Sequence, residues 1–172
     1  MKGLRIGLSL LMAVFLLCAL VYAAGIRFNT TPSIPVGMYR LTHDPIKKGA
    51  YVLFCPPPSA EFAMAKARGY LRAGFCPGGF GPMMKKILAI QDDKVMIGKE
   101  GVQVNGHLVP LSAPIKADAD GRPLPVYAKT WVLGNAEILV MSDSHPESFD
   151  GRYFGSIQRS QLKGVIRPIL IW

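Results

Sequence analysis

The chain has 172 residues, the length of one ordinary domain, and a formal net charge of +9 at pH 7. This charge would suit a nucleic-acid partner. However, the lysines and arginines are scattered singly or in pairs, with no basic stretch interleaved with aromatic residues, so we expect no nucleic-acid binding. The three histidines, His43, His107 and His145, lie far apart, and neither Cys-x-x-Cys nor His-Glu-x-x-His occurs. We therefore expect no metal site and no cofactor.

Residues 6–26 form an uncharged apolar run of 21 residues, enough to cross a hydrocarbon core of about 30 Å as a helix. Lys2 and Arg5 precede this run. The positive-inside rule therefore places the N-terminus in the cytoplasm and the rest of the chain on the outer side of the membrane. We expect a membrane anchor over residues 1–27 and an extracytoplasmic domain, in the bacterial periplasm, over residues 28–172.

A cleaved secretory signal is the competing interpretation of the apolar run. Val21-Tyr22-Ala23 resembles the small-x-small pattern that precedes a cleavage site, and cleavage would leave the domain free in the periplasm. A lipoprotein is less favoured, because the bulky Leu17 precedes Cys18 where acylation sites want a small residue.

A serine between two prolines follows the apolar run, in residues 30–39 (TTPSIPVGMY). Pro32 and Pro35 restrict the backbone on both sides of Ser33, so its hydroxyl points in a defined direction, as a nucleophile requires. The alternative is a rigid turn that only leads the chain out of a membrane segment.

The next segments predict strands over residues 37–41 and 50–54 and a helix over residues 60–71 that Ser59 can cap. Residues 75–82 contain enough glycine and proline to predict a loop. Outside the apolar run only Cys55 and Cys76 remain, and an even pair in an extracytoplasmic domain predicts one disulfide.

The second half of the chain predicts mostly short strands and tight turns. Strands are expected over residues 83–90 and 94–97, a type I′ hairpin at Asn105-Gly106, and two strands within residues 129–141. Residues 110–125, with four prolines, predict a linker or surface loop. In the last strand, residues 165–172, Pro168 predicts an edge position. The expected fold class is mainly β, with twisted antiparallel sheets or a partly closed barrel.

A serine hydroxyl is a weak nucleophile unless a base accepts its proton, and none of the histidines lies in a recognisable triad setting. A lysine, with an ordinary pKa of about 10.4, can act as that base only if burial lowers its pKa. Lys85 lies among apolar residues, whereas Lys86 faces the opposite side of the same strand. The alternative is that both are solvated lysines that protect a strand edge.

A polar segment, residues 142–155 (SDSHPESFDGRYFG), follows the strand over residues 138–141. Its short polar side chains favour a loop held by bonds between side chains and backbone, and Asp150 and Arg152 are spaced to pair across a turn.

In their order and spacing, these three stretches resemble the type I signal peptidases, membrane-anchored serine proteases with a serine–lysine dyad. The family has a serine just outside the first span, then a strand with Lys-Arg and a Gly-Asp turn, then a box Gly-Asp-Asn-x-x-x-Ser-x-Asp-Ser-Arg-Tyr-x-Gly. Ser33, Lys85-Lys86 with Asp92-Asp93, and residues 142–155 fill these places. The resemblance runs from about residue 29 to the C-terminus and implies the signal-peptidase fold.

The departures from the family pattern indicate a subfamily. Residues 33–39 (SIPVGMY) replace Ser-Met-x-Pro and resemble the TraF-type peptidases of conjugative transfer systems. Lys86 replaces an arginine, Ser142 a glycine and Ser144 an asparagine. These changes leave the dyad intact.

The resemblance implies a role for each matching position. Ser33 is the expected nucleophile and Lys85 the general base, and the backbone N–H of Ser33 and the hydroxyl of Thr31 are the expected oxyanion-hole donors. Ser148 matches the serine that orients the lysine. Asp150 and Arg152 match an ion pair that holds the loop, and Asp143 matches an aspartate that either is structural or tunes Lys85.

The expected function is therefore processing of leader peptides with small-x-small cleavage sites, in a pilin precursor or another conjugation component. The acyl-enzyme can be resolved by water or by an amine, and the sequence does not choose between them. One alternative is a housekeeping signal peptidase. Another is an anchored β-domain without enzymatic activity that serves in pilus or secretion assembly.

Overall fold

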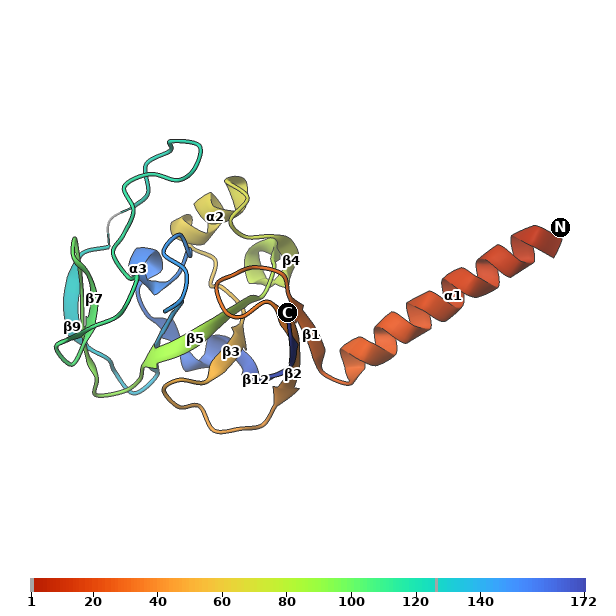
Figure 1. Ribbon diagram of the computed structural model, residues 1–172, viewed down its shortest axis with the longest axis horizontal. Coiled ribbons are helices and arrows are strands. Elements are labelled where there is room, and N and C mark those ends of the chain that lie inside the picture. The colour runs from red at the N-terminus through yellow and green to blue at the C-terminus, as the bar shows by residue number, and fades with distance from the viewer. Residues whose placement is uncertain (1, 126) are drawn as a thin grey trace.

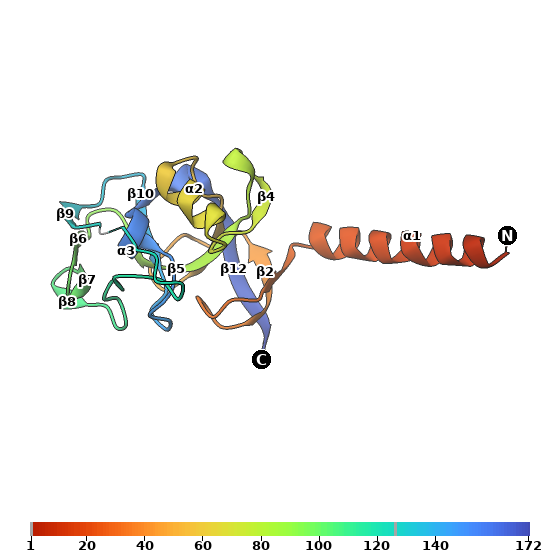
Figure 2. The same cartoon turned by 90° about the horizontal axis from the view of Figure 1, so that it is seen from above.

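The computed structural model describes residues 2–125 and 127–172. Its first element is the helix α1 (Lys2–Ala23), which projects away from a β-rich domain (Figure 1 and Figure 2). Residues Gly3–Ala23 have a mean hydropathy of 2.5 and none is buried, so this helix is long and apolar enough to cross a membrane.

The helix ends three residues before the apolar run from which it was predicted, which extends to Ile26. Gly25, with φ of 78°, turns the chain after Ala23, and residues Ile26–Asn29 form strand β1 instead of a further helical turn. The carbonyl oxygen of Gly25 accepts a hydrogen bond from the N–H of Leu41 at 2.9 Å, and Ile26 pairs with Arg40. Pairing with the next strand therefore decides where the helix ends.

The larger sheet has seven strands in the order β1-β2-β12-β3-β5-β10-β11, and the neighbouring strands pair antiparallel. After β1, its strands in chain order are β2 (Gly37–Thr42), β3 (Tyr51–Phe54), β5 (Met83–Ala89), β10 (Glu137–Met141), β11 (Ile157–Gln158) and β12 (Leu162–Ile171).

The smaller sheet has four strands in the order β8-β7-β6-β9. These strands are β6 (Lys94–Gly98), β7 (Gly101–Val104), β8 (His107–Leu108) and β9 (Lys129–Val132). The turn between β7 and β8 has positive φ at both Asn105 and Gly106, 53° and 82°, which confirms the predicted type I′ hairpin. The mainly β, antiparallel fold class is likewise confirmed.

Strand β10 lies between two hydrophobic cores. Ile138 and Val140 point into a core beneath the larger sheet, and Leu139 and Met141 point into a second core shared with the smaller sheet. All four side chains are fully buried, because alternate residues of a strand face opposite sides. A strand that is buried on both faces requires an uninterrupted apolar run, and residues 138–141 provide one.

The last strand differs from its prediction. β12 lies inside the sheet, between β2 and β3, and not at an edge. Its pairing with β3 covers residues 162–166 only, so Pro168 lies beyond that partner and pairs with Tyr39 of β2. A proline without an N–H group is tolerated there because the described pairing is one-sided at that position.

The segment between β3 and β5 contains helix α2 (Ala60–Ala67), strand β4 (Ala73–Cys76) and the 3₁₀ turn η1 (Pro77–Gly79). The helix ends four residues earlier than predicted, and the Ser59 hydroxyl donates to Glu61 and does not cap the helix. The loop predicted over residues 75–82 was also wrong in part, because Cys76 and Ala73 form β-bridges to Phe80.

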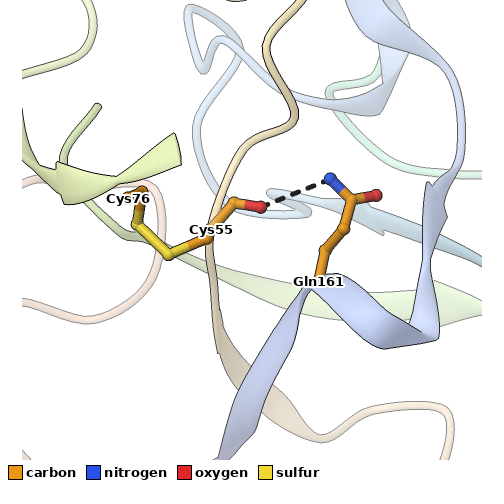
Figure 3. The surroundings of a disulfide bond; sticks show 3 residues. All are labelled: Cys55, Cys76 and Gln161. Atoms are coloured by element: carbon orange, nitrogen blue, oxygen red, sulfur yellow. Dashed lines mark hydrogen bonds between the residues drawn. A yellow bond between two sulfur atoms is a disulfide. The ribbon is translucent and has the colours of Figure 1, made fainter. Parts of the chain in front are cut away.

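A disulfide between Cys55 and Cys76, whose Cα atoms lie 5.4 Å apart, confirms the predicted pair (Figure 3). It joins the end of β3 to the end of β4. The side-chain amide of Gln161 donates to the carbonyl oxygen of Cys55 at 3.3 Å, which ties the same point to the start of β12. The disulfide therefore closes the segment between residues 55 and 76 into a loop that is held against the larger sheet.

Residues 110–125, predicted as a linker or surface loop, contain an ordered turn. Ala117 forms a β-bridge to Pro123, and the N–H of Asp118 donates to the carbonyl oxygen of Arg122 at 3.0 Å. We call residues 115–124 the hairpin below.

The short helix α3 (Gly151–Phe154) begins beside a buried ion pair. Arg152 Nε lies 2.8 Å from Asp150 Oδ1, and both side chains are fully buried. Arg152 Nη1 also donates to the carbonyl oxygens of Leu111 at 2.9 Å and Pro146 at 2.7 Å, so one guanidinium joins three segments. The ion pair expected at these two positions is present. The turn η2 (Arg159–Gln161) follows before β12.

We predict that Arg152→Ala lowers the free energy of unfolding by about 3–5 kcal/mol, because Asp150 would remain buried without its charge partner. The matched control is Arg167→Ala, which breaks the more exposed pair with Asp44 and should cost less than about 1 kcal/mol. Chemical unfolding of the full chain in detergent micelles measures both values. Equal losses in the two variants would contradict the account.

Candidate active site

The side chain of Asn29 organises the loop that contains Ser33, residues 30–36, which we call the serine loop. Asn29 is 5% exposed, and its amide donates to the carbonyl oxygens of Thr31, Ile34 and Pro35 at 2.8, 2.9 and 3.0 Å. Its Oδ1 accepts from the N–H of Thr31 at 3.2 Å. One buried side chain therefore fixes the backbone on both sides of Ser33.

Two further residues hold the same loop from below. The Ile34 side chain is buried in a small core with Tyr39, and the Tyr39 hydroxyl donates to the carbonyl oxygen of Pro35 at 2.6 Å. Desolvation by burial, with a smaller contribution from Tyr51, raises the pKa of Tyr39 to about 12. The hydroxyl consequently stays protonated and keeps donating over the physiological pH range.

Lys85 lies on the buried face of strand β5. Buried and half-buried residues alternate along this strand, which places Lys85 on the same face as Met83 and Ile87. Its side chain is 2% exposed. Burial lowers the pKa of Lys85 to about 8; Asp150 opposes this shift and Arg152 adds to it. At pH 7 about a tenth of the amine is therefore neutral, far more than for a lysine with an ordinary pKa.

Ser148 joins the lysine to the serine loop. Lys85 Nζ donates to Ser148 Oγ at 2.6 Å, and Ser148 Oγ donates to Ser33 Oγ at 3.3 Å. Among the residues that the structure describes, no hydrogen bond joins Lys85 directly to Ser33. The three side chains come from β5, the polar segment and the serine loop, and form one chain of polar contacts.

The polar segment is folded by its own side chains, as its composition predicted. Asp150 Oδ2 accepts from the N–H of Ser142 at 3.0 Å, and Ser142 Oγ accepts from the N–H of His145 at 3.0 Å. Together with the buried Arg152, these bonds fix the backbone on either side of Ser148.

Asp143 lies against Lys86 and not against Lys85. Its Oδ2 is 2.6 Å from Lys86 Nζ, and both side chains are partly exposed, 33% and 27%. The charges that shift the pKa of Lys85 are instead those of Asp150 and Arg152. Of the two roles left open for Asp143, this contact favours the structural one.

The hydroxyl of Thr31 is engaged within the serine loop. Thr31 Oγ1 donates to Asn29 Oδ1 at 3.1 Å. The hydroxyl proton of Thr31, which an oxyanion-hole donor would direct at the oxyanion, is therefore bonded to Asn29 Oδ1. Asn29 was not among the predicted site residues. The available signal was an asparagine two residues before a Thr-Pro pair, since asparagine side chains commonly bond to nearby backbone in turns.

A cavity of about 750 Å³ opens between the serine loop and strand β5, and Ser33, Lys85 and Ser148 line it. His145 also lines this cavity. Over residues 2–125 and 127–172, no group of three or more His, Cys, Asp or Glu side chains is placed to hold a metal ion. The chemistry that the described side chains can supply is a serine hydroxyl beside a buried amine.

Comparison with known proteins gives a consistent result. The family model described as signal peptidase, peptidase S26, matches residues 2–172. A plasmid transfer protein TraF of Escherichia coli is 60% identical over 161 residues, covering 93% of this chain and 90% of the relative. A conjugal transfer protein TraF of Agrobacterium fabrum is 39% identical over 147 residues, covering 84% and 82% of the two chains.

Among solved structures, a signal peptidase I from Enterococcus faecalis is similar at 15% identity and a TM-score of 0.40, covering 72% of this chain and 98% of that one. The family match spans nearly the whole sequence, and the relatives are similar over most of their length. The chain belongs to the signal peptidase family, peptidase S26.

Proposed function

We propose that this chain is a membrane-anchored serine endopeptidase that uses a Ser33–Lys85 dyad to process the leader peptides of exported proteins. The observation that supports this proposal best is the burial of Lys85 with its Nζ 2.6 Å from Ser148 Oγ, which in turn contacts Ser33 Oγ. A buried amine with a pKa of about 8 is a base suited to neutral pH.

In the first step Ser33 Oγ attacks the scissile carbonyl carbon, and its proton passes to neutral Lys85, directly or through the hydroxyl of Ser148. The C–N bond then breaks as Lys85 returns the proton to the leaving amine, which leaves an ester at Ser33. Water resolves this ester to give cleavage, whereas an amine would give a new peptide bond. Ser148 orients the lysine, and the Asp150–Arg152 pair keeps Ser148 in place.

The backbone N–H of Ser33 and the hydroxyl of Thr31 are the proposed oxyanion-hole donors. Thr31 must rotate its proton from Asn29 Oδ1 toward the oxyanion to act in this way. One such donor contributes about 3 kcal/mol to transition-state stabilisation.

The anchor helix ends three residues before strand β1, so the site lies close to the membrane surface. We propose that the domain faces the periplasm, where the ends of membrane-inserted leaders emerge. An extended small-x-small segment would bind by adding to an exposed strand edge. Strand β1, at the edge of the larger sheet and adjacent to the serine loop, provides one.

The TraF-named relatives support conjugative transfer as the setting, with a pilin precursor as the proposed substrate. A housekeeping signal peptidase would carry out the same chemistry on many precursors. Complementation of a strain depleted of its own signal peptidase separates these functions, because a specialised transfer peptidase should fail to restore growth.

We predict that Ser33→Ala and Lys85→Ala each abolish processing of a pilin precursor, because one removes the nucleophile and the other its base. Lys86→Ala is the matched control: Lys86 is the adjacent residue on the opposite face of β5 and should leave processing within a few-fold of wild type. Product masses from purified full-length proteins give the answer and separate cleavage from ligation, which differ by one water.

Normal processing by Ser33→Ala or Lys85→Ala protein that still folds and inserts would overturn the dyad. It would favour the alternative of an anchored β-domain that assembles a pilus or secretion complex without catalysis.

We predict that kcat/KM rises with pH and levels off above about pH 8, because Lys85 must be neutral to accept a proton and its pKa is lowered to about 8. At pH 7 about a tenth of the amine is neutral, so activity should be about tenfold below the plateau. Initial rates on a leader peptide between pH 6 and 10 test this. A midpoint near 10.5, the ordinary value for lysine, would contradict a buried base.

A further inference from the structure

The cavity at the candidate active site extends well beyond Ser33 and Lys85. Its far wall is formed by residues 69–72, which follow α2, and by the hairpin, residues 115–124. Both segments lie outside the stretches that carry the signal-peptidase motifs. The larger apolar and aromatic side chains in this part of the cavity are Tyr70, Leu71, Ile115, Leu124, Phe149 and Tyr153.

The aromatic part of this wall begins directly beside Ser148. The ring of Phe149 stacks on that of Tyr153, with centroids 5.8 Å apart and planes within 4°. The centroid of the Tyr70 ring also lies 5.8 Å from that of Phe149. The N–H of Ile115 donates to the Tyr153 hydroxyl at 3.1 Å, which joins the hairpin to the same surface. Apolar surface therefore continues from the reacting groups to the hairpin.

The hairpin is fastened to the segment after α2 by charged groups. Arg122 Nε lies 2.7 Å from Asp118 Oδ2, and the Tyr70 hydroxyl donates to the same oxygen. Arg68 Nη1 donates to the carbonyl oxygen of Pro123 at 2.8 Å. Asp118 lines the cavity, but with these partners its charge is compensated. Arg72, His145 and Glu147 also line the cavity, so the apolar side chains form one part of a mixed lining.

A cavity of about 750 Å³ lies in the range that encloses a drug-sized ligand, and is more than small side chains alone would need. Ser33, Lys85 and Ser148 line the same cavity, so a substrate side chain bound in it would lie close to the scissile bond. A peptide segment with a large side chain would fill more of it than a segment with small side chains alone. A charged side chain placed against the apolar part of the lining would lose hydration there.

We propose that the hairpin and residues 69–72 form a specificity pocket that takes a bulky apolar side chain of the precursor, close to the small residue at the scissile bond. The occupant is an extended peptide with leucine, isoleucine, methionine or phenylalanine at that position. This inference rests on the proposed function, since the peptide is the substrate of the same site.

The test uses full-length protein in detergent micelles and synthetic peptides with alanine before the scissile bond. At each of the other positions within three residues of that bond, the peptides carry either alanine or leucine. At one position leucine should raise kcat/KM by about tenfold or more, mainly through KM, as expected for a hydrophobic pocket. Equal kcat/KM for the alanine and leucine peptides at every position would overturn the proposal.

Variants of the hairpin test whether its residues cause the preference for leucine. Ala117→Leu, which fills the cavity from the hairpin, should remove the preference for leucine, and Leu124→Ala, which enlarges it, should weaken the preference. Lys116→Ala is the matched control, because Lys116 belongs to the hairpin but its side chain is exposed, and it should keep the wild-type preference. A preference unchanged in both cavity variants would overturn the assignment to this pocket.

Binding of labelled peptides to the Ser33→Ala protein, followed by fluorescence anisotropy, separates this proposal from the proposed function. Tighter binding of the leucine peptide to Ser33→Ala protein, lost in the double variant Ser33→Ala/Ala117→Leu, would support the pocket. If the wild-type protein nevertheless cleaved no peptide, only the peptidase function would be overturned. Cleavage without any leucine preference in rate or binding would overturn the pocket and leave the function standing.

Discussion

Burial of the Lys85 amine in the larger sheet is the constraint on which the candidate site depends. The alternation of strand β5 turns Lys85 inward with Met83 and Ile87, where desolvation lowers its pKa to about 8. Strands β3 and β10 flank β5 in the sheet, and Lys85 is 2% exposed. A charge removed from water must be partnered or neutralised. The short contact with Ser148 Oγ gives the amine one polar partner, and the charge of Asp150 opposes only part of the effect of burial on its pKa.

The rest of the site follows from placing Ser148 against that amine and Ser33 against Ser148. Ser148 lies in a segment fixed by the fully buried Asp150–Arg152 pair, and Ser33 lies in a loop fixed by the buried side chain of Asn29. Both supports act through backbone N–H and carbonyl groups, so they hold position without occupying the hydroxyls of Ser33 and Ser148. The exception is Thr31, whose hydroxyl proton Asn29 accepts. A substrate oxyanion would have to compete with that contact.

The sequence predicted local features well, because they depend on alternation and turn chemistry. Strand β5 with Lys85 inward, the Asn105-Gly106 hairpin and the Cys55–Cys76 disulfide were all anticipated and are present. Other features depend on partners distant in sequence. Strand β1 forms because β2 returns to pair with it, and Pro168 is accommodated because the pairing with β3 has ended before it. The hairpin of residues 115–124 is ordered by contacts with residues that follow α2. The contact of Asp143 with Lys86 likewise became visible only in three dimensions.

The proposed chemistry therefore depends on the ionisation state of Lys85, which can be measured without a substrate. Nuclear magnetic resonance of full-length protein in detergent micelles, labelled at lysine side chains and assigned with Lys85→Arg, would follow the amine of Lys85 from pH 6 to 11. We predict a midpoint of about 8, with Lys86 as an internal comparison on the partly exposed face of the same strand. A Lys85 midpoint at its ordinary value of about 10.5 would contradict the central claim that burial prepares this lysine to act as a base.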